Sequence, residues 1–160
     1  MLTESIGFYI SPIGDIKIVA GMNGLTSVVF TSQSVTENLF TSNEFIIDAI
    51  RWLDEYFKGH RPGWVPRLSL SGTKFQISVF RELLNIDYGT LVTYSQIAER
   101  AASASGRTGF SARSVGQAVG KNPIAIIIPC HRVCGANGLL TGYAWGLEKK
   151  RALIDFESTS

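Results

Sequence analysis

The stretch Pro129-Cys130-His131-Arg132-Val133 constrains this chain most, because it sets a thiol beside an imidazole. It follows the run 124–128, Ile-Ala-Ile-Ile-Ile, which is short, apolar and bounded by prolines. Such a run is typical of a buried strand, and Pro129 cannot continue a sheet ladder. We therefore predict a strand over 124–128 and a turn at Cys130, which is a rigid mount for a nucleophile.

A cysteine is mostly thiol at neutral pH and needs a base or a positive field to react. His131 could act as that base, directly or through a water. Most cysteines are buried and inert, so the Cys-His pair alone leaves a structural interpretation open. Cys130, Cys134, His131 and the distant His60 lack the spaced pairs of a zinc site. We predict no metal, no cofactor and no disulfide.

The composition fits a globular protein of one domain or two small ones. The chain has 160 residues, of which 45% are apolar and 18% charged, enough to bury a core. Residues 1–72 carry five basic and seven acidic side chains, and residues 73–160 carry ten and six, so the basic surplus accompanies the Cys-His pair. No run has the length of a membrane span, and Met1–Glu4 does not resemble a signal peptide. We expect a cytoplasmic protein with no membrane association.

The N-terminal part has the pattern of a small α/β unit. Strands are predicted over 8–10, 16–20 and 25–30, with a turn at 21–24. The apolar stripe Phe45, Ile46, Ala49, Ile50, Leu53 and Phe57 predicts a helix over 45–57. Prolines and glycines make 60–71 a connector, so we place one domain at 1–72 and a second at 73–160.

The C-terminal part is mainly helical. Helices are predicted over 73–85, 94–102, 111–120 and 147–156, with loops over 103–109 and from the Cys-His pair to 146. Thr93 and Gln96 fit a capping box at the start of the second helix. Two short helices followed by a strand indicate a helix-turn-helix or winged-helix module.

The helix predicted over 111–120 has an unusually bare face. Ala112, Gly116 and Gly120 recur at every fourth position, although glycine costs a helix roughly 1 kcal/mol relative to alanine. Two explanations are open: close packing against another protein element, or close approach to a nucleic-acid backbone. Arg113 lies beside this face, where it could reach into a duplex or remain a surface residue.

Six separated motifs resemble the O6-alkylguanine-DNA alkyltransferases, with their order kept from about Thr73 to Glu157. They are Gly89-Thr90-Leu91-Val92-Thr93-Tyr94, Ala112-Arg113-Ser114-Val115-Gly116, Asn122-Pro123, Ile128-Pro129-Cys130-His131-Arg132-Val133, Gly142-Tyr143 and Glu157. The resemblance implies an α/β protein with a small N-terminal α/β (ribonuclease-H-like) domain and a C-terminal winged-helix, helix-turn-helix-like domain. It also implies DNA repair by direct, irreversible transfer of the alkyl group from O6-alkylguanine, and from O4-alkylthymine, to the protein's own cysteine.

The resemblance further implies a role for individual residues. Cys130 would accept the alkyl group, His131 would deprotonate it through a water, and Glu157 would orient the imidazole. Asn122 would brace the turn, and Tyr94 would protonate the departing guanine. A monomer would bind double-stranded DNA in the minor groove and flip the damaged base out, with Arg113 filling the gap. Further DNA contacts are expected at Ala112, Ser114, Gly116 and Gly120, and the base pocket at Val133, Tyr143, Ala144 and Trp145.

Structural explanations stay open for several of these residues. Tyr94 could start a helix and pack on the core, and Glu157 could be a frayed surface carboxylate. Arg132 is better interpreted as an ion-pair partner than as a catalytic group, and Cys134 as inert. Trp145 is larger than the residue some relatives have there, so we hypothesise that it narrows the alkyl pocket.

Three other functions remain as alternatives. A non-catalytic damage sensor would lack the cysteine. A winged-helix transcription factor would carry a side-chain-rich recognition helix for the major groove, unlike the bare face of 111–120. A thiol hydrolase built on Cys130, His131 and Glu157 would turn over repeatedly without DNA.

Overall fold

The computed structural model describes residues 3–33 and 41–160, and it divides into two compact units. The first comprises residues 1–71, 123–125 and 160, and the second comprises 72–122 and 126–159. Of the N-terminal stretch examined for a signal peptide, Met1 and Leu2 lie outside the described residues. Across the described part, no helix has the length and hydropathy that a membrane span requires.

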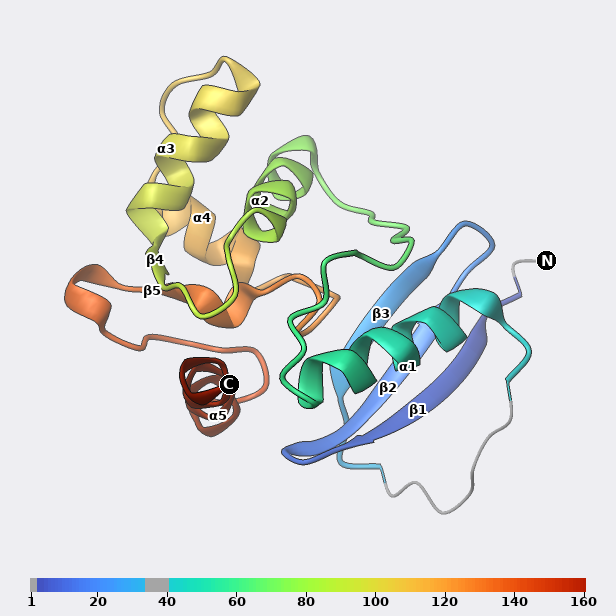
Figure 1. The fold of residues 1–160 in the computed structure, drawn as a ribbon. Coiled ribbons are helices and arrows are strands. Elements are labelled where there is room, and N and C mark those ends of the chain that lie inside the picture. Colours follow the sequence, from blue (N-terminus) through green and yellow to red (C-terminus); the bar gives the residue numbers. More distant parts are fainter. Residues whose placement is uncertain (1–2, 34–40) are drawn as a thin grey trace. The chain divides into compact units, whose positions relative to one another are not determined.

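The first unit is a three-stranded antiparallel sheet with one helix on its face (Figure 1). The strands are β1 (Ser5–Ser11), β2 (Gly14–Ala20) and β3 (Leu25–Phe30), in the order β1-β2-β3. Residues Ile16, Ile18 and Ala20 of β2 alternate inward, as a half-buried strand requires. A register shift at Val19/Ala20 lets both Leu25 and Val28 of β3 be buried although they are three residues apart.

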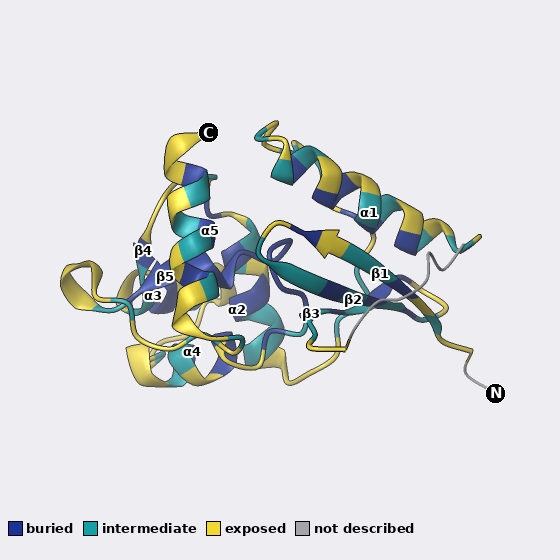
Figure 2. Ribbon diagram, turned by 90° about the horizontal axis from the view of Figure 1, so that it is seen from below, coloured by how far each residue is buried: buried dark blue, intermediate teal, exposed yellow. Residues whose placement is uncertain are grey.

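Helix α1 (Glu44–Phe57) begins at Asn43, whose side chain accepts hydrogen bonds from the backbone N–H groups of Phe45 and Ile46. Its buried face differs from the predicted stripe: Trp52 and Tyr56 are buried with Ile46, Ala49 and Leu53. The alternation of buried and exposed residues along α1 is visible in Figure 2. At β1, a Cβ on Gly7 would lie 2.5 Å from the Ile46 side chain, so glycine permits this close approach.

The second unit packs three helices together: α2 (Lys74–Leu84), α3 (Tyr94–Ser105) and α4 (Ala112–Val119). Each begins with a capping box, at Thr73, Thr93 and Ser111, so these helix starts were set by local sequence. Helix α3 extends three residues past its predicted end because Gly106 supplies the left-handed cap, with φ of 66°. The predicted loop 103–109 is therefore wrong at 103–105, which are helical.

The remaining elements of the second unit carry the Cys-His segment. They are β4 (Val92–Thr93), the 3-10 turns η1 (Cys130–Arg132) and η2 (Ala136–Gly138), β5 (Val133–Cys134) and α5 (Leu147–Thr159). Strands β4 and β5 form a short parallel pair that the sequence did not predict. Helix α5 starts where predicted and ends three residues later, so Glu157 lies within it.

The predicted strand over 124–128 is wrong. Only Ile124 forms a bridge, to Val28 of β3, and Ile126 has φ of 68°, so the chain turns there. All five residues are nevertheless buried. The apolar run indicated burial correctly, but hydrophobicity alone does not separate a strand from a buried turn.

Candidate active site

Cys130 is held on a tight turn and is almost completely buried, with 3% of its surface exposed. Its backbone N–H donates to the Ile128 carbonyl at 2.8 Å. The Asn122 side-chain amide donates to the same carbonyl at 3.0 Å and also hydrogen-bonds the Cys130 side chain. Asn122 therefore contacts both the backbone of the turn and the sulfur.

Burial raises the pKa of the Cys130 thiol to about 11, although the Asn122 hydrogen bond and the charge of Lys150 oppose the shift. At pH 7 about one molecule in 10⁴ then carries a thiolate at Cys130. The resting cysteine is a protected thiol, and its reaction requires a proton acceptor close by.

His131 is buried beside Cys130, and its Nε2 lies 2.5 Å from Oε2 of Glu157 on α5. Burial lowers the pKa of His131 and outweighs the hydrogen bond to Glu157, so the imidazole is neutral at pH 7. A neutral ring bonded to a carboxylate through Nε2 carries its proton there and leaves Nδ1 as the basic nitrogen. Nδ1 is buried and has no hydrogen-bond partner in the described part of the chain.

Glu157 is the centre of a buried ionic cluster and not a frayed surface carboxylate. Its Oε1 accepts from Arg132 Nε at 2.8 Å and from the Gly89 N–H at 2.9 Å, and Oε2 accepts from Arg132 Nη2 at 3.1 Å. Burial alone would raise the pKa of Glu157, but His131 and Arg132 hold it well below its usual range. Arg132 also donates to the Ile86 carbonyl at 2.8 Å. The prediction of Arg132 as an ion-pair partner is confirmed.

Cys130 lines a cavity of about 240 Å³ in the second unit. The other lining residues are Tyr94, Gly116, Val119, Gly120, Gly142, Tyr143 and Ala144. Two predicted pocket residues, Val133 and Trp145, are not among them. Val133 is buried in β5 opposite Val92, and the Trp145 ring packs edge-on against Tyr143 at 5.2 Å between centroids. The family resemblance implied a pocket position for both side chains. In the structure Val133 pairs within the short parallel sheet, and Trp145 contacts Tyr143, which does line the cavity.

Two tyrosines line this cavity, and their hydroxyl groups differ in hydrogen bonding. The Tyr94 hydroxyl accepts a hydrogen bond from Thr141 Oγ1 at 3.4 Å. The Tyr143 hydroxyl is buried and has no partner among the described residues. Burial, followed by the charges of Cys130 and Glu157, raises the pKa of Tyr143 well above its usual value. Both hydroxyls have a proton free to donate to a ligand in the cavity.

Helix α4 presents its bare face to the cavity through Gly116 and Gly120. A Cβ on Gly116 would lie 3.8 Å from the Tyr94 ring, an ordinary contact, and one on Gly120 would meet only backbone oxygens, at 3.5 Å. Packing within the protein therefore does not require these glycines. Ala112 and Arg113 are exposed in the first turn of α4, and Ser114 is half-buried, its hydroxyl bonded back to Ser111.

Lys150 is a buried lysine next to this cavity that the sequence did not single out. Its Nζ donates to the Gly142 carbonyl at 3.0 Å. One feature of the sequence could have indicated that Lys150 is buried: it precedes Glu157 by seven residues, which places both side chains on one face of a helix. Throughout residues 3–33 and 41–160, no three His, Cys, Asp or Glu side chains could together hold a metal ion.

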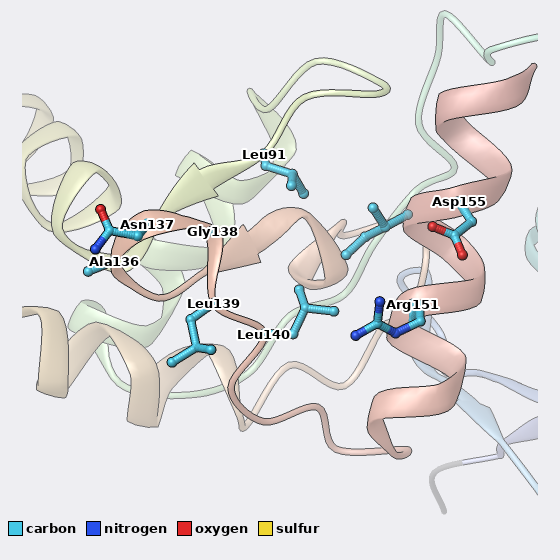
Figure 3. Close-up of a pocket in the computed structure, with 9 residues that line it drawn as sticks. Leu91, Ala136, Asn137, Gly138, Leu139, Leu140, Arg151 and Asp155 are labelled. Carbon is cyan, nitrogen blue, oxygen red and sulfur yellow. The ribbon is translucent and has the colours of Figure 1, made fainter.

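A larger and more open pocket of about 600 Å³ lies between the η2 loop and α5 (Figure 3). It is lined by Leu91, Ala136, Asn137, Gly138, Leu139, Leu140, Arg151, Ile154 and Asp155. It contains neither the cysteine nor the histidine, so size alone does not identify the reactive site.

Comparison with known families matches both units of the chain. Residues 74–159 match the 6-O-methylguanine DNA methyltransferase, DNA binding domain, and residues 6–62 match the ribonuclease-like domain of the same methyltransferases. The chain belongs to the 6-O-methylguanine DNA methyltransferase family. The predicted family and the predicted mixed α/β class are confirmed.

Relatives in this family match over nearly their whole length. A methylated-DNA–protein-cysteine methyltransferase of Methanosarcina acetivorans is 40% identical over 153 residues, which cover 93% of this chain and 95% of the relative. One from Mycobacterium leprae is 39% identical over 150 residues, covering 92% and 88%. The chain is therefore a methylated-DNA–protein-cysteine methyltransferase by class.

Solved structures of the same family have a similar fold. The Mycobacterium tuberculosis O6-methylguanine methyltransferase is 38% identical and superposes with a TM-score of 0.82, covering 98% of this chain and 94% of that one. The same M. tuberculosis protein in complex with DNA gives a TM-score of 0.81 at 38% identity, covering 96% and 92%. The fold of each unit is thus that of a family with a DNA-bound member.

Proposed function

We propose that this protein repairs DNA by transferring the alkyl group of O6-alkylguanine to Cys130, once per molecule. The main support for this proposal comes from the arrangement of two neighbouring residues. Cys130 lines a cavity, and the basic nitrogen Nδ1 of His131 has no hydrogen-bond partner among the described residues. A nucleophile, a base and a carboxylate that orients the base are the parts that cysteine alkylation requires.

The reaction needs the thiol proton to move before or during attack. His131 takes that proton at Nδ1 through a water, and the ionised Glu157 stabilises the imidazolium that forms. The thiolate sulfur then bonds to the alkyl carbon while the bond from that carbon to O6 breaks. The electron pair goes to the guanine, where Tyr94 supplies a proton. The Tyr94 phenolate then regains a proton from solvent and the His131 imidazolium gives one up, so the net products are a thioether and an unmodified guanine.

DNA binding follows from α4 and its first turn. The M. tuberculosis structure with DNA supports assigning duplex DNA as the partner of this chain. The bare face of α4 suits a narrow minor groove, with Ala112, Ser114, Gly116 and Gly120 close to the backbone and Arg113 replacing the flipped base. Since no intramolecular contact demands the glycines, the close approach to DNA is the better explanation for them.

Several finer assignments belong to the same proposal. O4-alkylthymine is a second substrate, the protein acts as a monomer in the cytoplasm, and residues 73–160 hold both the DNA-binding and the alkyl-transfer machinery. Tyr143 and Ala144 form the base pocket. Trp145 limits the size of the alkyl group indirectly, by fixing the Tyr143 ring against which it packs.

The test is the intact mass of the protein after incubation with a duplex that contains one O6-methylguanine. Wild type and Cys134→Ser should each gain one methyl group, and Cys130→Ser should gain none. Cys134 is the matched control because it is equally buried in the same segment.

Two results would contradict the proposal. A wild-type protein that binds the duplex without gaining mass would be a damage sensor. A methyl group on Cys134 with Cys130 unmodified would place the acceptor elsewhere.

A further inference from the structure

A backbone turn contacts the carboxylate that orients His131, and the proposed reaction does not use this turn. The turn is Asp87–Thr90, which lies between α2 and β4. Within it, the backbone N–H of Gly89 donates to Oε1 of Glu157 at 2.9 Å. The contact joins residues far apart in the sequence, so the position of the turn bears on the position of the carboxylate.

The hydrogen bonds to Glu157 show what the turn contributes. Oε1 accepts from Arg132 Nε and from the Gly89 N–H, and Oε2 accepts from Arg132 Nη2 and from His131 Nε2. An ionised carboxylate has about four lone-pair sites, and these donors can fill them. Because Gly89 and Arg132 both bind Oε1, the other oxygen is directed at His131. The Gly89 N–H is the one of these four donors that lies outside η1.

The residues next to Gly89 hold the Arg132 side chain as well. The Ile86 carbonyl accepts from Arg132 Nη1 at 2.8 Å, and the guanidinium carbon lies 5.5 Å from the centroid of the Tyr88 ring. One short stretch of backbone therefore binds both members of the buried ion pair. Since Arg132 belongs to η1, this stretch also ties η1 to the rest of the second unit.

The turn has a defined conformation that its sequence requires. The Thr90 N–H donates to the Asp87 carbonyl at 3.1 Å, and Gly89, the third residue, has φ of 76°. A positive φ at the third residue alone is typical of a type II turn. Both ends are held, because the Ile86 N–H donates to the Leu83 carbonyl at 3.1 Å and β4 pairs with β5.

Conformation, and not space, calls for glycine at position 89. A Cβ on Gly89 would lie 3.5 Å from the Glu157 backbone oxygen, which is an ordinary contact. The positive φ is another matter, because a β-branched residue is strongly disfavoured there, whereas asparagine tolerates it. A β-branched residue would rotate the backbone and turn the N–H away from Glu157.

We propose that Gly89 is a positioning residue for alkyl transfer: its left-handed conformation aims its backbone N–H at Glu157 and so fixes the carboxylate that orients His131. The assignment rests on the proposed role of His131 as the base. Gly89 does not line the cavity, so it acts through Glu157 and not on the substrate.

The test compares Gly89→Val with Gly89→Asn, which add a Cβ at the same place but differ in tolerance of a positive φ. With the O6-methylguanine duplex, we expect Gly89→Val to lower the transfer rate at saturating duplex about tenfold and Gly89→Asn to restore it. The duplex concentration for half-maximal rate should stay unchanged, because the turn is not part of the face of α4 proposed to approach DNA.

A second readout follows the base without DNA. The ring proton between His131 Nε2 and Glu157 can be observed by proton NMR. In Gly89→Val its resonance should move upfield and exchange faster with water, and in Gly89→Asn it should match wild type. A merely structural glycine would change stability without moving this resonance.

Gly138→Val is the control for backbone strain. Gly138 is exposed, has the same φ of 76°, and a Cβ there would meet nothing within 4 Å. Its urea midpoint should fall about as far as that of Gly89→Val, while its saturating transfer rate and its His131 resonance should follow wild type. Gly89→Ala imposes a milder strain and replaces Gly89→Val in both readouts if the valine variant does not fold.

Two results would overturn the assignment. One is a Gly89→Val protein whose saturating rate and His131 resonance coincide with those of wild type. The other is a Gly89→Asn protein as slow as Gly89→Val, because the left-handed conformation would then not be the cause. A wild type that accepts no methyl group from the duplex overturns the proposed function instead, and the NMR comparison still tests the contact between Gly89 and Glu157.

Discussion

Helices α4 and α5 both serve the Cys130 cavity, and they do so by opposite means. Helix α4 and its C-cap line the cavity with two glycines, Gly116 and Gly120, and with the side chain of Val119. Helix α5 contributes buried charge, through Lys150 and Glu157. We therefore expect the two helices to tolerate different substitutions. A larger side chain on the bare face of α4 should weaken DNA binding and leave the fold intact, whereas a lost charge or hydrogen-bond acceptor on α5 should destabilise the fold.

The largest expected effect is on α5. Glu157→Gln removes the charge that pairs with Arg132, and an amide cannot accept all the hydrogen bonds that the carboxylate accepts. Because the Arg132 charge then stays buried without compensation, we expect a loss of about 3–5 kcal/mol in the free energy of unfolding, measured by urea denaturation.

Glu148→Gln is the control for this substitution, since Glu148 is exposed in the first turn of the same helix. Its effect should stay within about 0.5 kcal/mol. If both variants unfolded at the same urea concentration, the buried cluster would not be what constrains α5.

The second-largest expected effect is a pH dependence of stability that comes from the Cys130 thiol. Burial raises the pKa of Cys130 to about 11, so the folded state holds this proton more tightly than the unfolded chain does. The resulting stabilisation is complete below about pH 8.5 and is lost as the pH rises through the folded pKa. The raised pKa of Cys130 contributes about 3 kcal/mol to the free energy of unfolding at low pH.

Urea denaturation of wild type and Cys130→Ala between pH 7 and 10 checks this pH dependence. The stability difference between them should move in favour of Cys130→Ala as the pH rises. A difference independent of pH would mean that Cys130 has the same pKa in the folded and the unfolded protein, and a difference that moves in favour of wild type would mean that the fold stabilises the thiolate.

The smallest effect is on α4. Gly116→Ala places a Cβ at ordinary distance from the Tyr94 ring, so the folded protein should accept it and gain about 0.5–1 kcal/mol from helix propensity. Fluorescence anisotropy with a duplex should show weaker binding, because the methyl group occupies the face proposed to approach DNA. Gln117→Ala, an exposed neighbour, is the control. Lower stability with unchanged DNA binding would reverse the interpretation of the bare face.

Local sequence was sufficient for much of the fold. The helix starts at Thr73, Thr93 and Ser111 follow from capping boxes, which need only four consecutive residues. The strand predicted over 124–128 failed because the left-handed conformation of Ile126 is imposed by the packing around it and has no signature in an isoleucine.

Site residues that are adjacent in the sequence could be predicted from it, whereas those brought together only by the fold were harder to predict. Cys130 and His131 stood out as a pair, whereas Glu157 and Asn122 were expected only from the family resemblance. Lys150 was missed because lysines are rarely buried, and only the tertiary structure shows the carbonyl that binds this one. Val133 and Trp145, which the resemblance implied for the base pocket, are not lining residues of the cavity: Val133 is buried in the β4–β5 pair, and Trp145 packs on the Tyr143 ring.

The most direct test of the account is the number of guanines restored per protein molecule, measured with a large excess of duplex carrying a radiolabelled O6-methyl group. The account predicts that the reaction stops at one methyl transferred per molecule, with all of the label on Cys130. Continued transfer of label beyond one equivalent per protein molecule, or no label on the protein at all, would contradict it.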